Sequence, residues 1–475
     1  MKIQIGLIVF ALICIVSALS SKVDPLVLQN LHRSSRTNIL LKFKNNNVKS
    51  AHARFDNLAL TSRSAKLSIL YNILKDQADS TQANVISLLQ SQKNKNHQIY
   101  QLWMSNELIL RNADAQTVEL LSQQPDVDTI VGERIFPLAP VKTHELDPNE
   151  AVTPLAQWGV ETVRADKVHE EGNTGEGIVV ANIDTGVRYT HEALRNNYRG
   201  AVNNNNHNYA WYDPNLRSEI PNDSHGHGTH VMGTIVGSTN GIGIAPGATW
   251  MACKGCVPAG CYEFDLLICG NWIGCPTDLQ GRNEDCSKAP NIVNNSWGGG
   301  VNDPFYDDII EAWRRGNIAP LFVAGNSGTR CSTIESPGDR NGTITVGSTA
   351  STNELSTFSS VGPTTGGLMK PDIAAPGTSI VSASGSSDTG YATMSGTSMA
   401  CPHVAGVAAL LNKVKPGLTV DELLDALNAG AQAVSSGAKT CNNVRDDVYP
   451  NYHVGSGRLD ALASVEYLQS KVKIN

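Results

Sequence analysis

The pattern of apolar and polar residues divides the chain into two regions. From about residue 155 onward, short continuous apolar runs alternate with helical stretches, at 177–183, 249–253, 292–294, 318–323 and 343–346. Runs that are apolar on both faces are typical of parallel strands covered by helices on both sides. We therefore predict an α/β architecture for residues 155–475, with a doubly wound, mainly parallel sheet.

Residues 21–141 show a more mixed pattern. The expected elements are a strand at 38–44, helices near 50–75 and 80–92, strands within 98–110, a helix at 114–123 and a strand at 127–131. This order predicts a small α+β (ferredoxin-like) unit with split β-α-β elements. Residues 142–154 lack apolar periodicity and contain prolines, which predicts a linker.

The first 20 residues predict a secretory signal peptide. Lys2 precedes a 12-residue apolar run at 5–16, and Ala18-Leu19-Ser20 forms a small-x-small cleavage site. The run is too short to span a bilayer. We expect a secreted, extracellular protein that does not enter a membrane.

Composition narrows the class of protein. The chain is 41% apolar and 17% charged, with a formal net charge of −7, which argues against a nucleic-acid-binding protein. Basic residues outnumber acidic ones in residues 21–141, and the reverse holds from residue 142 onward. Opposite charges of this kind would suit docking between the two regions.

The chain contains ten cysteines, of which Cys14 lies in the predicted signal peptide. In an oxidising compartment the other nine are expected mainly in disulfides. Zinc is the alternative at Cys253 and Cys256, but no second Cys or His pair follows at finger spacing. Cys401 is predicted to be the unpaired thiol, which leaves eight cysteines for four bridges of open connectivity.

Ser398 is the strongest candidate for a catalytic residue. It lies directly before a small, apolar run at 404–411 that predicts a buried helix. A serine at a helix start can direct its hydroxyl and backbone N–H at a bound carbonyl, near the positive end of the helix dipole. A serine hydroxyl needs a base to become a nucleophile.

Suitable partners occur upstream. Asp184 ends a predicted strand, His227 lies between Gly226 and Gly228, and Asn326 follows another strand. Each alone would fit a cap or a turn. Together they occur in the order Asp, His, Ser, which distinguishes the subtilisin-type triad from the other serine hydrolase orders.

Residues 155–465 resemble the catalytic domain of subtilisin-family serine peptidases, and most of all their bacillopeptidase F branch. The matching segments are Ile183-Asp184-Thr185-Gly186, His227-Gly228-Thr229-His230-Val231, Asn294-Asn295-Ser296-Trp297-Gly298-Gly299, Ala324-Gly325-Asn326 and Gly396-Thr397-Ser398-Met399-Ala400. Residues 38–136 more loosely resemble the family's inhibitory prodomain, so residues 21–141 are predicted to be that prodomain.

The resemblance implies a role for each residue. Ser398 would be the nucleophile, His227 the general base and acid, and Asp184 the residue that orients the imidazole. Asn326 and the Ser398 N–H would bind the oxyanion. Substrate would be bound by Ser296, Trp297, Gly298, Gly299, Ala324 and Gly325.

The resemblance also implies an activity. We expect an endopeptidase that works through an acyl-enzyme and is made as a zymogen. Its predicted partners are protein and peptide substrates and its own prodomain, which would be removed by a cut between residues 136 and 152. We expect a monomer that binds neither nucleic acid nor membrane.

Two departures from the family bear on specificity. Ser327 follows Asn326 where some relatives carry an acid, and no acidic cluster follows Gly298 directly. We therefore expect a wide, uncharged pocket and broad specificity. The chemistry requires no cofactor; calcium is common in the family, but no metal-ligand set is readable from this sequence.

Three other classes of protein were weighed. Asp184-Thr185-Gly186 and Asp388-Thr389-Gly390 could be the two halves of an aspartic peptidase, but the second lies in a predicted loop. An inactive protein on the same fold would lack a triad member, and none is missing. The glycines between 241 and 247 have the wrong spacing for a dinucleotide-binding loop.

Overall fold

The computed structural model describes residues 21–92, 97–138, 142–147, 155–435 and 437–472. The predicted signal peptide and most of the predicted linker lie outside these residues. The chain forms two compact units. Of the described residues, unit one contains those up to Ala59 together with those in Ile69–Ile135 and Tyr262–Ile268, and unit two contains all the others.

Unit one is built on a four-stranded antiparallel sheet. Its strand order is β2 (Gln98–Leu102), β3 (Glu107–Asp114), β1 (Arg36–Phe43) and β4 (Val127–Gly132). The helices that accompany it are α2 (Pro25–Arg33), α3 (Val48–Asp56), α4 (Arg63–Ser91) and α5 (Ala115–Ser122). Ile39, Leu41, Leu108 and Leu110 alternate inward from β1 and β3 and form the centre of its core.

The helices of this region begin and end at other residues than the sequence predicted. Helices were expected near 50–75 and 80–92, whereas α3 ends at Asp56 and α4 runs without interruption from Arg63 to Ser91. The polar stretch at 75–81 interrupts the apolar periodicity but not the helix, because its residues tolerate helical dihedrals and Lys75 pairs with Asp79 one turn later.

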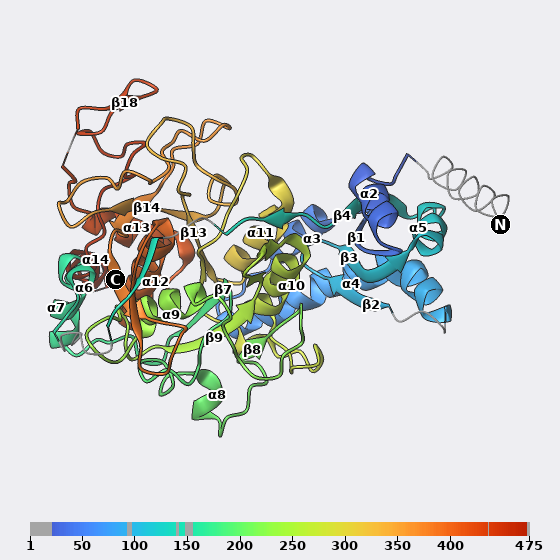
Figure 1. The fold of residues 1–475 in the computed structure, drawn as a ribbon, viewed down its shortest axis with the longest axis horizontal. Helices are drawn as coiled ribbons and strands as arrows, with labels where there is room; N and C mark the ends of the chain where they lie inside the picture. Colours follow the sequence, from blue (N-terminus) through green and yellow to red (C-terminus); the bar gives the residue numbers. More distant parts are fainter. Residues whose placement is uncertain (1–20, 93–96, 139–141, 148–154, 436, 473–475) are drawn as a thin grey trace. The chain divides into compact units, whose positions relative to one another are not determined.

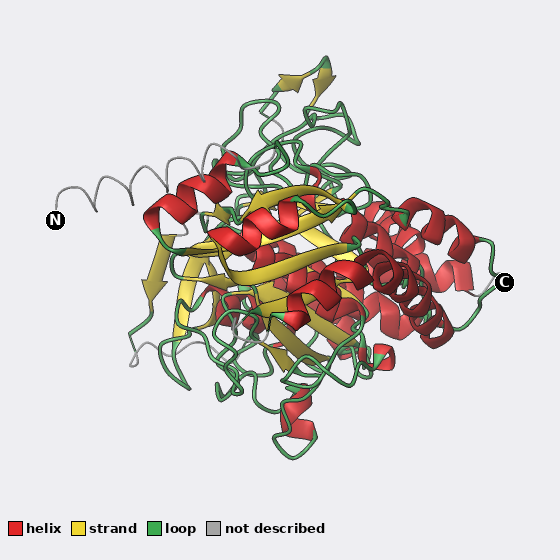
Figure 2. Ribbon diagram, turned by 90° about the vertical axis from the view of Figure 1, so that its right-hand side faces the viewer, coloured by secondary structure: helices red, strands yellow, loops and turns green. Residues whose placement is uncertain are grey.

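Unit two contains a seven-stranded parallel sheet. Its order is β15 (Ile373–Pro376), β14 (Ile344–Thr349), β13 (Ala319–Val323), β12 (Ile292–Asn295), β7 (Val179–Asp184), β9 (Thr249–Lys254) and β8 (Trp211–Tyr212). The strands stack side by side with helices grouped against them (Figure 2). The predicted doubly wound α/β sheet is confirmed, and the five predicted strands are all present. The short outer strands β8 and β15 were not predicted.

Helices cover both faces of this sheet (Figure 1). One face is covered by α9 (His227–Val236) and α12 (Thr397–Val414), and the other by α10 (Glu263–Gly274) and α11 (Asp307–Arg315). On the second face, Trp313 Nε1 donates a hydrogen bond to the Gly270 carbonyl at 3.0 Å and ties α11 to α10. On the first, the apolar side chains of α9 and α12 belong to one large core with the sheet.

Smaller elements complete unit two. The helices are α6 (Trp158–Thr162), α7 (Ala165–Glu170), α8 (Arg199–Val202), α13 (Val420–Gly430), α14 (Ala461–Val472) and the 3₁₀ turns η1 (Cys286–Lys288) and η2 (Pro304–Tyr306). An antiparallel sheet joins β16 (Ile380–Ala383), β17 (Tyr391–Ser395) and β6 (Lys142–Glu145). Hairpins pair β10 (Cys256–Val257) with β11 (Gly260–Tyr262) and β18 (Thr440–Cys441) with β19 (Val444–Arg445). The two-residue strand β5 (Ile135–Phe136) lies where unit one passes into unit two.

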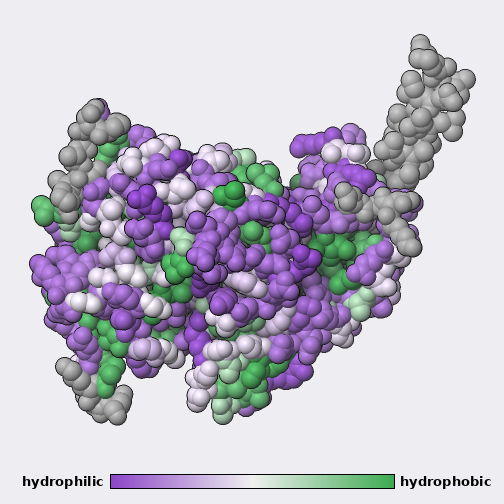
Figure 3. Space-filling view, turned by 90° about the horizontal axis from the view of Figure 1, so that it is seen from below, coloured by the Kyte–Doolittle hydropathy of each residue, from purple (hydrophilic) through white to green (hydrophobic). Residues whose placement is uncertain are grey.

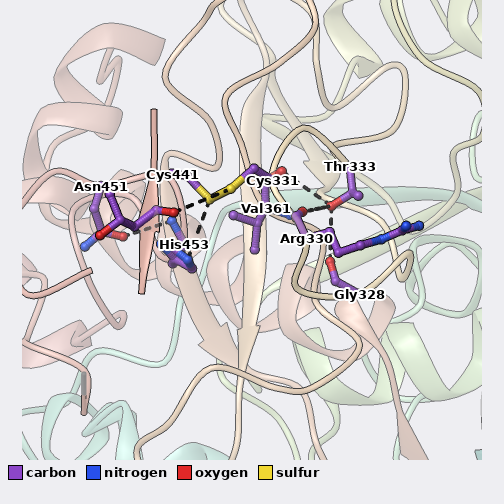
Figure 4. Close-up of a disulfide and its surroundings, with 9 residues drawn as sticks. Gly328, Arg330, Cys331, Thr333, Val361, Cys441, Asn451 and His453 are labelled. Atoms are coloured by element: carbon purple, nitrogen blue, oxygen red, sulfur yellow. Dashed lines mark hydrogen bonds between the residues drawn. A yellow bond between two sulfur atoms is a disulfide. The ribbon is translucent and has the colours of Figure 1, made fainter. Parts of the chain in front are cut away.

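Four disulfides form among the described residues, as the cysteine count predicted. They are Cys253–Cys269, Cys256–Cys261, Cys275–Cys286 and Cys331–Cys441. Cys401 is the buried free thiol, also as predicted, and burial raises its pKa well above the ordinary value. The last bridge joins the loop after Asn326 to the β18–β19 hairpin (Figure 4).

The face shown in Figure 3 is predominantly hydrophilic, with apolar residues in separate patches. Within the described part of the chain, no helix is long and apolar enough to cross a membrane.

Candidate active site

The carboxyl ends of neighbouring strands bring the predicted site residues to one edge of the unit-two sheet. Asp184 is the last residue of β7, Ser296 follows β12, and Asn326 follows β13 shortly after its end. His227 and Ser398 lie in the first turns of α9 and α12. Parallel sheets gather polar side chains at this edge because their strands all point toward it.

Asp184 and His227 form a buried hydrogen-bonded pair. His227 Nδ1 lies 2.8 Å from Asp184 Oδ1, and their side chains are 3% and 1% exposed. The backbone N–H of Thr185 also donates to Asp184 Oδ1 at 2.7 Å. A carboxylate at this distance holds Nδ1 as the protonated nitrogen and leaves Nε2 as the acceptor.

The pKa of His227 reflects two opposing effects. Burial alone disfavours the charged imidazolium and would lower the pKa. The adjacent Asp184 carboxylate outweighs burial, with a further contribution from Asp223, so the net pKa of His227 is raised above its ordinary value. The pair is therefore suited to holding a proton during a reaction.

Ser398 is buried and bonded to the strand beside it. Its Oγ donates to the Ser296 carbonyl at 3.2 Å, and Ser296 Oγ donates to the Ser398 carbonyl at 3.0 Å. Among the described contacts there is no hydrogen bond between Ser398 and His227. Such bonds are often loose in free enzymes and tighten only when substrate binds.

Asn326 is fixed with its amide nitrogen available. Its Oδ1 accepts hydrogen bonds from the Thr397 N–H and the Thr397 hydroxyl, both at 2.9 Å. Because the oxygen is occupied, the NH₂ group of Asn326 is the end left to donate. The Ser398 N–H lies in the first turn of α12, where backbone donors have no intrahelical acceptor.

The predicted substrate-binding residues follow two neighbouring strands, β12 and β13. Ser296 contacts Ser398 directly, and Trp297 behind it is buried with its ring centroid 5.4 Å from that of Phe322. After β13, Gly325 adopts a φ of 106°, a conformation that favours glycine. Gly298 and Gly299 both lie beside the Ser336 carbonyl, which accepts a hydrogen bond from the Gly299 N–H at 2.9 Å.

Asp223 is a site residue that the sequence analysis missed. Its Oδ1 accepts from the Thr185 hydroxyl and from the N–H groups of His225 and Gly226, at 2.8–3.0 Å. Its Oδ2 accepts from the N–H and hydroxyl of Thr229. Asp223 therefore fastens the start of α9 to the turn after β7. The available signal was an acid just before a helix start.

Glu335 is the second residue that was missed, and it bears on the expected specificity. A Cβ atom built on Gly325 would lie 2.8 Å from Glu335 Oε1. A carboxylate therefore lies beside a predicted pocket-lining residue, which argues against the expectation of an uncharged pocket. The sequence analysis looked for acids directly after Gly298 and Asn326, whereas the loop after Asn326 returns Glu335 to Gly325.

The remaining histidines of the motifs are bound elsewhere. His230 Nε2 lies 3.0 Å from the Ile380 carbonyl, and His403 Nδ1 lies 2.8 Å from the Met399 carbonyl. Burial lowers their pKa values to about 3 and about 4, so both are neutral at ordinary pH. No cluster of His, Cys, Asp or Glu that could hold a metal ion occurs in the described ranges.

The aspartic peptidase alternative fails on geometry. Asp388 is half exposed and binds Arg188 and Thr190, each at 2.6 Å. Its hydrogen bond from the Thr190 hydroxyl, followed by that from Arg188, lowers its pKa. Asp184, by contrast, is buried against His227. The two aspartates do not share a proton.

Comparison with known proteins gives consistent similarities. The profile described as "Subtilase family" matches residues 175–457. Bacillopeptidase F of Bacillus subtilis (strain 168) is 34% identical over 94% of this chain and 32% of its own length. Serine protease AprX of the same strain is 35% identical over 59% of this chain and 68% of its own length, and subtilisin E is 31% identical over 58% and 65%. The chain thus spans about a third of the length of bacillopeptidase F.

Proposed function

The chain belongs to the subtilase family of serine peptidases, and from this we propose that it is a secreted endopeptidase made as a self-processing zymogen. The observation that carries the proposal is the buried Asp184–His227 pair at the same sheet edge as Ser398, with Asn326 held against Thr397. These are the base, the nucleophile and the oxyanion donor that acyl transfer requires.

In the first half of the proposed reaction, Ser398 Oγ attacks the carbonyl carbon of the scissile peptide bond. Its proton passes to His227 Nε2, and the negative charge of Asp184 stabilises the imidazolium that forms. The carbonyl oxygen becomes an oxyanion that accepts hydrogen bonds from the Asn326 amide and the Ser398 N–H.

The carbon–nitrogen bond then breaks, and His227 gives its proton to the leaving amine. The acyl group remains on Ser398 as an ester. A water molecule gives a proton to His227 and attacks the ester, and collapse of the second tetrahedral intermediate returns the proton to Ser398 and releases the acid.

The proposed zymogen is supported by contacts around residue 136. Phe136 stacks on Phe305 with ring centroids 5.0 Å apart, and a Cβ atom on Gly299 would lie 3.2 Å from Phe136 Cδ1. The chain that leaves the predicted prodomain therefore lies against a predicted substrate-binding residue. A segment in this position would hinder substrate until it is cut.

Two acids of α10 support the same proposal within unit one. Glu263 accepts from Arg134 Nε at 2.8 Å and Nη2 at 2.6 Å, and Asp265 pairs with Arg111. Arg134 and Arg111 belong to the predicted prodomain, whereas α10 lies in the predicted peptidase region. These ion pairs link residues of the basic region to two buried acids of the acidic region, which supports the proposed docking.

The expectation of broad specificity depended on an uncharged pocket, and the place of Glu335 beside Gly325 argues against it. The other expectations stand as part of the proposal: substrates that are proteins or peptides, a monomer, and no cofactor in the chemistry.

The test is labelling of secreted wild type and Ser398→Ala with a fluorophosphonate probe, resolved by size. We expect a labelled band near the mature mass for wild type and an unlabelled, full-length Ser398→Ala chain. A folded, processed wild type that takes no label would overturn the proposal. Processing of Ser398→Ala at the wild-type rate would show that another peptidase makes the cut.

A further inference from the structure

We propose that Glu335 makes the enzyme selective for Lys or Arg at the position before the cut (P1). The inference rests on the proposed function, because it names the substrate class of the same site. It is carried by the place of Glu335 between the two segments that follow β12 and β13.

The backbone of Glu335 and Ser336 joins these two segments. Glu335 N–H donates to the Ala324 carbonyl at 3.0 Å, beside Asn326. Ser336 N–H donates to the Gly300 carbonyl at 3.1 Å, and Ser336 O accepts from the Gly299 N–H at 2.9 Å. One dipeptide thus spans from the oxyanion side of the site to the Ser296–Gly300 side.

The side chain of Glu335 lies against the glycines of both segments. A Cβ atom on Gly325 would lie 2.5 Å from Glu335 Cδ, and one on Gly298 would lie 3.8 Å from Glu335 Cβ. Both glycines are predicted to line the P1 pocket. Because neither carries a side chain, nothing on these two residues separates a P1 side chain from the carboxylate.

The carboxylate is not neutralised by a basic partner. Ser327 Oγ donates to Glu335 Oε1 at 2.6 Å. No ion pair to Glu335 and no hydrogen bond to its Oε2 is found within the described residues. The half-buried carboxylate therefore has an oxygen available to a ligand. An ammonium or guanidinium group suits this oxygen, since charge-assisted hydrogen bonds to carboxylates are the strong ones.

The loop that carries Glu335 is firmly held. Cys331 is bonded to Cys441, and Thr333 Oγ1 accepts from the Val361 N–H at 3.0 Å while lying 2.9 Å from the Arg330 carbonyl (Figure 4). A carboxylate on a fixed loop is a better specificity determinant than one on a mobile loop, because less ordering is needed when substrate binds.

The test compares otherwise identical peptide substrates with Lys, Arg, Phe or Leu at P1. We expect wild type to show a higher kcat/KM for Lys and Arg than for Phe and Leu. Glu335→Gln should lower the Lys-to-Phe ratio about 10- to 100-fold, the effect of losing one charged hydrogen bond. Glu335→Asp, which keeps the charge, should retain part of the preference. Glu284→Gln, which removes an exposed acid elsewhere, should leave the ratio unchanged.

A second measurement needs no variant. Matched peptide aldehydes ending in arginine or phenylalanine should inhibit wild type, with the arginine aldehyde binding at least about 10-fold more tightly. Equal inhibition, or a Lys-to-Phe ratio that Glu335→Gln does not move, would overturn the role of Glu335. If wild type cleaves no peptide and takes no fluorophosphonate, the proposed peptidase activity itself fails.

Discussion

Asp223 Oδ1 accepts a hydrogen bond from Thr185 Oγ1 at 2.9 Å, although the two residues lie 38 positions apart in the sequence. Thr185 Oγ1 in turn accepts from the Gly228 N–H at 2.9 Å. Through these two bonds the turn that carries Asp184 is locked to the helix that carries His227. Asp223 therefore positions the pair without touching it.

Replacing Asp223 by Asn should lower kcat/KM about 10- to 100-fold, because an amide cannot accept hydrogen bonds on both of its ends. The loss of negative charge should also lower the pKa of His227, whose raised value includes a contribution from Asp223. A pH–rate profile separates the two effects. A purely structural role would lower activity without moving the acidic limb, and Asp388→Asn, at an exposed ion pair, is the matched control.

In the pH–rate profile of wild type, the pKa of the acidic limb should lie above the ordinary histidine pKa of about 6.5. His227 acts as a base only when neutral, so activity falls as pH drops through its raised pKa. In Asp184→Asn the main interaction that raises this pKa is lost while burial remains, so the limb should move to lower pH. The residual kcat should be about 10⁴-fold lower, as in other triad peptidases. An unmoved limb in Asp184→Asn would contradict this assignment.

Gly228→Ala should nearly abolish activity. The added Cβ would lie 2.1 Å from the Gly186 carbonyl and 3.1 Å from Asp184 Cβ, so the start of α9 must move away from β7. Activity and thermal unfolding of the variant measure this. Gly366→Ala is the control, since its nearest neighbour would be 3.8 Å away. Wild-type activity in Gly228→Ala would mean that the spacing of Asp184 and His227 is not critical.

Self-processing should occur after Lys142, so that the mature chain begins at Thr143. Lys142 is the only Lys or Arg in the predicted window of 136–152, and the proposed role of Glu335 favours a basic P1 residue. N-terminal sequencing of the mature enzyme measures the cut, and Lys142→Gln should slow it about 10-fold or more. Cleavage at another position with normal kinetics in Lys142→Gln would separate maturation from the role of Glu335.

The sequence predicted those features that depend on local pattern. Asp184, His227 and Ser398 each lie where a strand ends or a helix begins, and the apolar runs before or after them predict those boundaries. Strand β8 was missed because two residues are too few to show a pattern, and β15 was missed because its short apolar run ends in a proline. The single helix α4 was split because a polar stretch was taken as a break.

Asp223 and Glu335 could not be predicted in the same way. One of the donors to the Asp223 carboxylate is Thr185, which lies in the turn after β7 and is far from Asp223 in sequence. Glu335 reaches Gly325 only because the loop between them folds back and pairs with the Ala324 carbonyl. Neither contact is associated with a periodic sequence pattern, since each depends on tertiary structure.

A peptidase that cuts after basic residues can also be cleaved by other copies of itself. The Cys331–Cys441 disulfide affects how fast such self-digestion inactivates it. Arg330 is exposed in the loop that carries Glu335. A cut between Arg330 and Cys331 would create a new chain end, but Cys331 would stay attached to Cys441. Cleavage of folded proteins depends on how often a segment opens, and the bridge restricts that opening. The working lifetime of the proposed secreted enzyme should therefore depend on this disulfide.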